Sequence, residues 1–450
     1  MTAISLWIYV CCGALIWLCW LLRKDRLSLG LPIAYLFALL LIHVPGAFAH
    51  AFTGVQLYTR GSAVIEVGIR LTAISSLCFV VGVWIARLSG RRAAEAAPHE
   101  LYISHKYEFW WFCVVGGFML TYGLSFLRNV PSIGAAIEKG GAVWMLGVLL
   151  GLRSAVERND VKRVCIWLAV LMVYPTLMLL FGGFLSYGSS AIIIVLSALV
   201  VSTRSQWRVL VTACCGIFVG LTIFVNYFSH RDEIRRTVWS GAGLEERVNV
   251  VADAFSTRFE WFDPTNREHL IALDRRLNQN YFAGLAATRI QEGRGDYIYG
   301  RSIWEALLSL VPRILWPDKP VFAGSPEIVS EMTGLHLSPT TSFGVGNVME
   351  LQINFGLPGL VIGFCAFGWL LGMLDRKAAL AESSGNLQSL LLLFLVSVAL
   401  IQPNGSLVEM LSGAAAAFLA AYGWAWTWKR WAGRGSAVRR ARTTDTSAPL

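Results

Sequence analysis

Four cationic residues in this sequence have the type and placement needed to bind a phosphate group. Arg231 and Arg235 follow a long apolar run, and their spacing of four places them on one helix face if that run continues as a helix. Arg313 and Lys319 lie in a later segment that contains three prolines. Guanidinium groups pair with phosphate oxygens through two hydrogen bonds, and an ammonium group adds a point charge. All four are therefore candidate pyrophosphate-binding residues, although cations that only face a membrane interface or solvent fit the same pattern.

A carboxylate and an amide, Glu350 and Asn354, stand four residues apart at the start of another apolar run. A carboxylate inside a membrane helix is costly, so it marks a candidate site by default. Glu350 is the candidate general base for an attacking hydroxyl, and Asn354 is the candidate substrate-binding residue on the same helix face. A structural ion pair between Glu350 and an arginine of the preceding loop fits this position equally well.

The elements that position these residues are membrane helices. The 450 residues are 56% hydrophobic and 15% charged, with a mean hydropathy of +0.57, a composition typical of integral membrane proteins. A helix needs roughly 20 apolar residues to cross a bilayer. The sequence predicts an all-α polytopic membrane protein with about 11 transmembrane helices, of which the fifth and seventh are short for a span. They are expected at residues 3–22, 28–48, 62–86, 108–127, 141–156, 164–182, 187–202, 209–227, 346–373, 386–402 and 406–428.

The basic residues predict the orientation, because short loops rich in Lys and Arg stay cytoplasmic. An outside N-terminus puts 21 Lys/Arg on the cytoplasmic side, against three in the short outer loops. Residues 1–227 then form eight spans, 228–345 a large periplasmic loop, 346–428 three more spans, and 429–450 a basic, disordered cytoplasmic tail. Within the loop, apolar spacing predicts an amphipathic helix over 270–285 and an interfacial helix over 302–316.

Several classes of partner are not indicated. The nine cysteines all fall in predicted spans and no Cys/His cluster has metal-ligand spacing, so we expect no metal and no cofactor. The net charge of +10 largely reflects the cytoplasmic loops, which favours membrane lipid over nucleic acid as the partner for those charges.

The order of these parts resembles the Wzy-type polymerases of bacterial O-antigen and exopolysaccharide synthesis. The shared architecture is many spans, one large late outer loop, a Pro-Arg-x-x-x-Pro-x-Lys-Pro run and a Glu-x-x-x-Asn-Phe-Gly-x-x-Gly entry into a span. The residues that form the two motifs are Pro312, Arg313, Pro317, Lys319, Pro320, Glu350, Asn354, Phe355, Gly356 and Gly359. The specific motifs cover only about residues 300–360.

The resemblance implies a metal-independent glycosyltransferase of the bacterial inner membrane. Its substrate would be an oligosaccharide repeat unit linked to undecaprenyl pyrophosphate, and its partners would include a flippase and a chain-length regulator. In this interpretation Arg313 and Glu350 are catalytic, while Lys319, Arg231, Arg235 and Asn354 bind the pyrophosphate or glycan. Two alternatives stay open: an O-antigen ligase, which shares the architecture, and a flippase or other transporter, for which internal repeats and deep charges would be expected.

Overall fold

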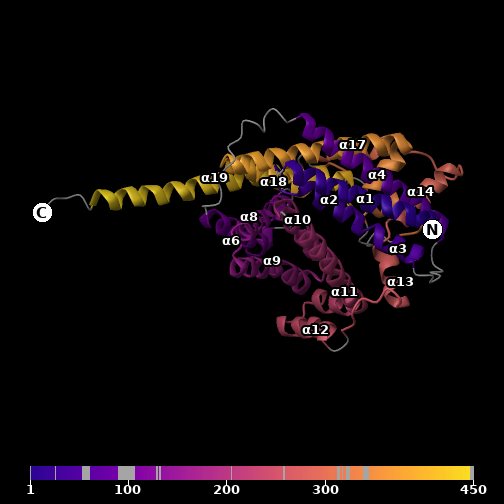
Figure 1. Cartoon of the computed structure of the whole chain (residues 1–450), viewed down its shortest axis with the longest axis horizontal. Coiled ribbons are helices and arrows are strands. Elements are labelled where there is room, and N and C mark those ends of the chain that lie inside the picture. Colours follow the sequence, from indigo (N-terminus) through magenta and orange to yellow (C-terminus); the bar gives the residue numbers. More distant parts are fainter. Residues whose placement is uncertain are drawn as a thin grey trace.

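All secondary-structure elements that the structure, a computed structural model, describes in this chain are helices (Figure 1). The described residues are 2–25, 27–52, 61–89, 107–127, 130, 133–203, 205–256, 259–311, 315–316, 318–320, 325–337 and 344–445. Seven helices in these ranges are long and apolar enough to cross a membrane, or eight if one bent pair is a single span. The predicted class, an all-helical polytopic membrane protein, is therefore confirmed at this level.

The helices before the central region form most of the bundle. They are α1 (Ala3–Asp25), α2 (Leu31–Leu41), α3 (Val44–Phe52), α4 (Ser62–Ser89), α6 (Tyr107–Phe118), α7 (Ile133–Gly141), α8 (Val143–Glu157), α9 (Val161–Gly182), α10 (Ser186–Ser202) and α11 (Gln206–Trp239). A π-helical turn at Met119–Gly123 and a 3-10 turn at Ser125–Leu127 follow α6. The pair α2 and α3 is bent by 44° at its break.

The central region contributes five shorter helices, and three long or apolar helices close the chain. The central ones are α12 (Leu244–Ser256), α13 (Arg267–Arg276), α14 (Asn280–Gln291), α15 (Arg301–Ser309) and α16 (Ser325–Thr333). They are followed by α17 (Asn347–Ser383), α18 (Leu387–Leu400) and α19 (Leu407–Asp445). The long end of α19 extends away from the bundle (Figure 1). The chain from residue 429 to Asp445 is therefore helical, where the sequence predicted a disordered tail.

Glycines let α4 and α17 pack closely at the centre of the bundle. A Cβ atom on Gly82 would lie 2.1 Å from the Cys365 carbonyl oxygen, and one on Gly368 would lie 2.1 Å from that of Phe79. Small residues allow this approach of backbones, which is how membrane helices gain packing energy without a hydrophobic driving force. The close packing fixes α17, and with it Glu350, relative to α4.

The central helices α13 and α14 are docked against α3 and α4 (Figure 1). A Cβ on Gly68 would lie 2.0 Å from the Asn280 carbonyl oxygen, and one on Gly284 would lie 2.0 Å from that of Val64. The sequence predicted one amphipathic helix over 270–285. It is interrupted at 277–279, where Asn278 Nδ2 donates to Asp274 Oδ1 at 2.6 Å.

A buried chain of polar side chains fixes this docking. Asn280 Nδ2 donates to the His43 carbonyl oxygen at 2.6 Å, and its Oδ1 lies 2.8 Å from His43 Nδ1. Thr72 adds a hydroxyl 3.1 Å from the same Asn280 oxygen, and His50 Nε2 lies 2.9 Å from Asp274 Oδ1. Buried polar groups need such partners, so the network positions α13 and α14 on the membrane helices.

Candidate functional site

Arg231 and Arg235 lie on one face of α11, because the helix continues twelve residues beyond the predicted span end at 227. Arg235 lies over the ring of Phe184, with its guanidinium carbon 4.6 Å from the ring centroid, and its Nε donates to the Gly183 carbonyl oxygen at 3.4 Å. The centroid of the Trp239 ring lies 5.6 Å from the same guanidinium carbon. These aromatic contacts hold the guanidinium in place through cation–π attraction.

A third arginine, Arg276 at the end of α13, joins these two. The guanidinium carbons of Arg231 and Arg276 both lie 5.9 Å from the centroid of the Phe228 ring. Burial lowers the pKa of Arg276, and the charges of Arg231 and Arg235 lower it further. We call Arg231, Arg235 and Arg276 the arginine cluster.

Little negative charge offsets the arginine cluster within the described ranges. Its one ion pair there joins Arg231 Nε to Asp232 Oδ1 at 3.7 Å, and the Asp232 side chain is 81% exposed. Arg231 Nε is buried and has no hydrogen-bond partner among described residues. Three clustered guanidinium groups with so weak a counter-charge favour an anion with several oxygens, such as a pyrophosphate.

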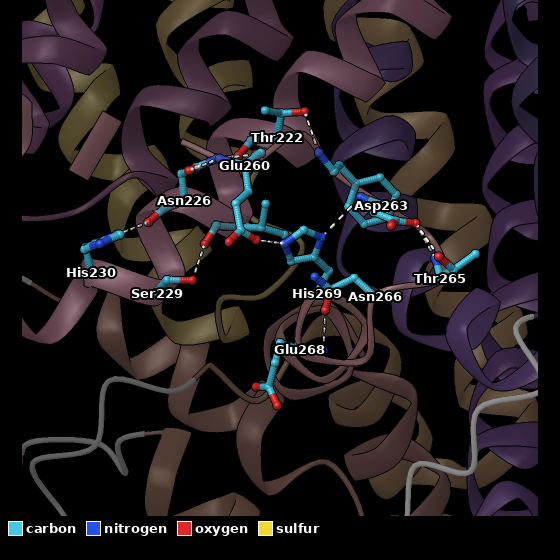
Figure 2. A network of polar contacts seen from close by, with 12 residues as sticks. Thr222, Asn226, Ser229, His230, Glu260, Asp263, Thr265, Asn266, Glu268 and His269 are labelled. Carbon is cyan, nitrogen blue, oxygen red and sulfur yellow. Dashed lines mark hydrogen bonds and ion pairs between the residues drawn. The ribbon is translucent and has the colours of Figure 1, made fainter. Parts of the chain in front are cut away.

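A second set of contacts fixes α13 against α11 (Figure 2). The Asn226 side chain donates to the Glu260 carbonyl oxygen at 2.7 Å and accepts from the Glu260 backbone N–H at 3.0 Å. His269 Nδ1 accepts from the Asp263 backbone N–H at 3.1 Å, which leaves Nε2 to donate to Glu260 Oε2 at 3.1 Å. Two hydrogen bonds from Thr265 hold the pKa of Asp263 below its usual range. This folded segment determines where Arg276 lies.

Glu350 and Asn354 occupy the first two turns of α17, and both are fully buried. Glu350 Oε2 accepts from the Leu407 backbone N–H at 2.8 Å, at the start of α19. Asn354 Nδ2 donates to Ser302 Oγ of α15 at 2.8 Å. The helix is broken directly afterwards, at Phe355 and Gly356, where φ and ψ leave the helical range. The predicted structural alternative, an arginine paired with Glu350, is not found among the described residues.

Lys319 has a position that favours a structural role. Its ammonium group donates to the carbonyl oxygens of Ser309 and Val311, at 2.7 and 2.9 Å. A cation at this place neutralises the C-terminal end of α15. Arg313, the predicted catalytic cation, lies outside the described residues, as do Pro312 and Pro317, so its role stays a prediction.

The structure does not bring all the predicted site residues together. The arginine cluster lies between α11 and α13, whereas Glu350 and Asn354 lie between α15, α17 and α19. No interaction between described residues links the two places directly. Sequence reasoning missed Arg276 and Ser302, because only the packing of α13 on α11 and of α15 on α17 places them there.

Comparisons with known proteins identify no relative of this chain. No family model, no curated protein and no solved structure matches the chain. The described part of the chain holds no group of three or more His, Cys, Asp or Glu residues arranged to bind a metal ion.

Proposed function

We propose that this protein is a membrane glycosyltransferase that polymerises oligosaccharide repeat units linked to undecaprenyl pyrophosphate. The observation that carries the proposal is the arginine cluster at the end of α11. An apolar helix long enough to cross a membrane ends beside three cations that have little counter-charge. A lipid pyrophosphate has the matching form, because its hydrocarbon chain lies in the bilayer and its anionic group lies at the surface.

The finer topology belongs to this proposal. It comprises about 11 spans, an outside N-terminus, a cytoplasmic C-terminus and the 228–345 loop on the periplasmic face of a bacterial inner membrane. The exposure of Trp304 and Leu307 on α15 supports an interfacial position for that part of the loop, since Ser302 and Ala306 face inward instead.

In the proposed reaction, the terminal hydroxyl of one repeat unit attacks the anomeric carbon of a second, lipid-linked chain. The new bond forms between that hydroxyl oxygen and the anomeric carbon, and the bond from this carbon to the pyrophosphate oxygen breaks. Glu350 takes the hydroxyl proton, and undecaprenyl pyrophosphate leaves with the bonding electrons. Arg313 is the cation expected to stabilise the charge that develops on this leaving group.

The test uses the purified full chain in lipid vesicles, supplied with the lipid-linked repeat unit of the host cell. The wild-type protein is expected to make a ladder of longer lipid-linked glycans, and Arg231→Ala/Arg276→Ala to reduce its rate at least about 100-fold, because two charge-assisted contacts are lost. Arg275→Ala is the matched control, since Arg275 is the neighbouring arginine on α13 and is equally exposed, but only Arg276 lies over the Phe228 ring beside Arg231.

Each other outcome contradicts the polymerase in a distinct way. Transfer of glycan only when a lipid A core acceptor is added would indicate a ligase. Movement of labelled substrate across the vesicle membrane, with no new glycosidic bond, would indicate a transporter. Equal loss of activity in Arg275→Ala would show that the arginine cluster has no special role.

A further inference from the structure

Around Glu350, three buried acceptor atoms have no hydrogen-bond donor among the described residues. They are Glu350 Oε1, Asn354 Oδ1 and Glu305 Oε2. A buried polar atom without a partner costs on the order of 1–3 kcal/mol, so native structures keep few of them without a reason. Glu350 and Asn354 are both 0% exposed, so water does not reach these atoms from the surface.

The three acceptors belong to one cluster, because Ser302 and the helix spacing tie them together. Ser302 Oγ accepts from Asn354 Nδ2 at 2.8 Å and lies beside the Glu350 carboxylate. Glu305 lies one turn further along α15, close enough for its charge to act on Glu350. We call Ser302, Glu305, Glu350 and Asn354 the Glu350 cluster.

The chain beside the Glu350 cluster is aromatic and conformationally unusual. A Cβ on Gly356 would lie 2.9 Å from the Tyr297 hydroxyl oxygen, so Tyr297 lies against the break in α17. Tyr299 is 74% exposed and has a φ of 42°, in the left-handed region that non-glycine residues seldom adopt. Strain of this kind persists only where the surrounding structure imposes it, and it gathers at functional sites. Phe355, at the break itself, is also exposed.

A ligand for this cluster must donate hydrogen bonds, because the unsatisfied atoms are all acceptors. Sugar hydroxyls do so, and the apolar faces of sugar rings suit the neighbouring tyrosines. A phosphate is excluded as the ligand, since Glu305 and Glu350 would repel it. A metal ion is not favoured either, because no three His, Cys, Asp or Glu side chains in the described ranges are arranged to hold one.

We infer that the Glu350 cluster binds the hydroxyl groups of the substrate's glycan, while the arginine cluster binds the pyrophosphate of the same molecule. This inference rests on the proposed function. Two separate clusters can then bind different parts of one substrate, because an oligosaccharide lies between the pyrophosphate and the terminal hydroxyl of a repeat unit. The α13–α14 segment, which contacts α11 at one end and α17 at the other, sets the distance between them.

Two probes separate the two clusters in the full chain reconstituted in nanodiscs. One is undecaprenyl pyrophosphate without sugar, and the other is the host's lipid-linked repeat unit. We expect wild-type protein to bind the second probe at least about tenfold more tightly than the first. Glu350→Gln should remove most of the extra affinity for the lipid-linked repeat unit and leave the affinity for undecaprenyl pyrophosphate unchanged. Arg276→Ala should instead lower the affinity for both probes by the same factor.

Glu409→Gln is the matched control, because Glu409 lies in the same first turn of α19 and forms a capping box with Ser406. Asn354→Leu is the second variant of the Glu350 cluster, so the test does not depend on one substitution. The inference is overturned if both variants of the Glu350 cluster still bind the lipid-linked repeat unit more tightly than undecaprenyl pyrophosphate by the wild-type factor. It is also overturned if Glu409→Gln removes this difference in affinity equally. Wild-type protein that binds undecaprenyl pyrophosphate no better than a neutral lipid would instead refute the proposed function.

Discussion

Two buried carboxylates, Asp375 and Glu350, lie toward opposite ends of α17. Both accept hydrogen bonds from backbone N–H groups, but among the described residues only Asp375 has a partner for each of its two oxygens. Asp375 Oδ1 accepts from the backbone N–H groups of Leu29 and Leu31, at 2.9 and 3.2 Å, and its Oδ2 accepts from Arg87 at 2.6 Å. Glu350 Oε2 likewise accepts from a backbone N–H at a helix start, but its Oε1 has no partner among the described residues. They lie 25 residues apart, on either side of the break at Phe355 and Gly356.

The charges around the two carboxylates also differ in how completely they are paired. Beside Asp375, Arg153 pairs with Glu382 at 2.9 Å and with Glu157 at 3.1 Å, so positive and negative charges are matched. Around Glu350, acceptor atoms gather in the Glu350 cluster, and no ion pair between described residues joins Glu350 or Glu305 to a cation. A matched buried pair is costly to break from one side, whereas unmatched buried charges reduce stability and are kept where a ligand uses them. Under the proposed function, we therefore expect a structural role for the Asp375 end of α17 and a chemical role for the Glu350 end.

The first and largest expected effect tests the chemical end. Glu350→Gln keeps an oxygen that can accept from Leu407 but removes the proton acceptor. We expect the single-turnover rate of glycan transfer, at saturating substrate, to fall about 100- to 10,000-fold, as for loss of a general base. The melting temperature should stay close to wild type. A rate within a factor of three of wild type would contradict the role of Glu350 as the base.

The same isosteric change at the other end should affect stability instead. Asp375→Asn leaves the Arg87 guanidinium buried without its carboxylate, which costs about 3 kcal/mol or more when one partner of a buried pair is removed. We expect a markedly lower melting temperature in detergent and less folded protein. The transfer rate per folded molecule should remain unchanged, and a loss of rate without a loss of stability would reverse the assignment of the two ends.

Sequence reasoning predicted the all-helical membrane class but not the contacts that distinguish these ends. Apolar runs predict helices of this class because hydropathy is a local property, whereas the 11 predicted spans stay a prediction beside the seven or eight candidates in the described ranges. The clustering of Arg276 with Arg231 depends on how α13 folds back, through the contacts of Asn226 and His269, and no local pattern encodes it. The Glu350 to Leu407 hydrogen bond likewise depends on a pairing between two distant turns, in which Asn347 N donates to the Pro403 carbonyl oxygen at 3.0 Å.

The smallest expected effect concerns the balance between stability and binding in the arginine cluster. Three like charges repel each other, and Arg276, although exposed, is partly desolvated by its neighbours, so removing its charge should stabilise the protein in the absence of an anion. We expect Arg276→Gln to raise the free energy of unfolding by about 0.5 kcal/mol, a modest gain because solvent screens part of the repulsion.

Added pyrophosphate should make the wild-type protein more stable than Arg276→Gln, which is the reverse of the order expected without an anion. A ligand that binds only the folded state stabilises it in proportion to its affinity, so wild-type protein should gain more in melting temperature than Arg276→Gln as pyrophosphate is titrated. Arg275→Gln, which changes the neighbouring charge outside the arginine cluster, should behave like wild type in both conditions. If Arg276→Gln is instead less stable than wild type without anion, Arg276 is a structural residue like Asp375, and the arginine cluster belongs with the matched end of the molecule.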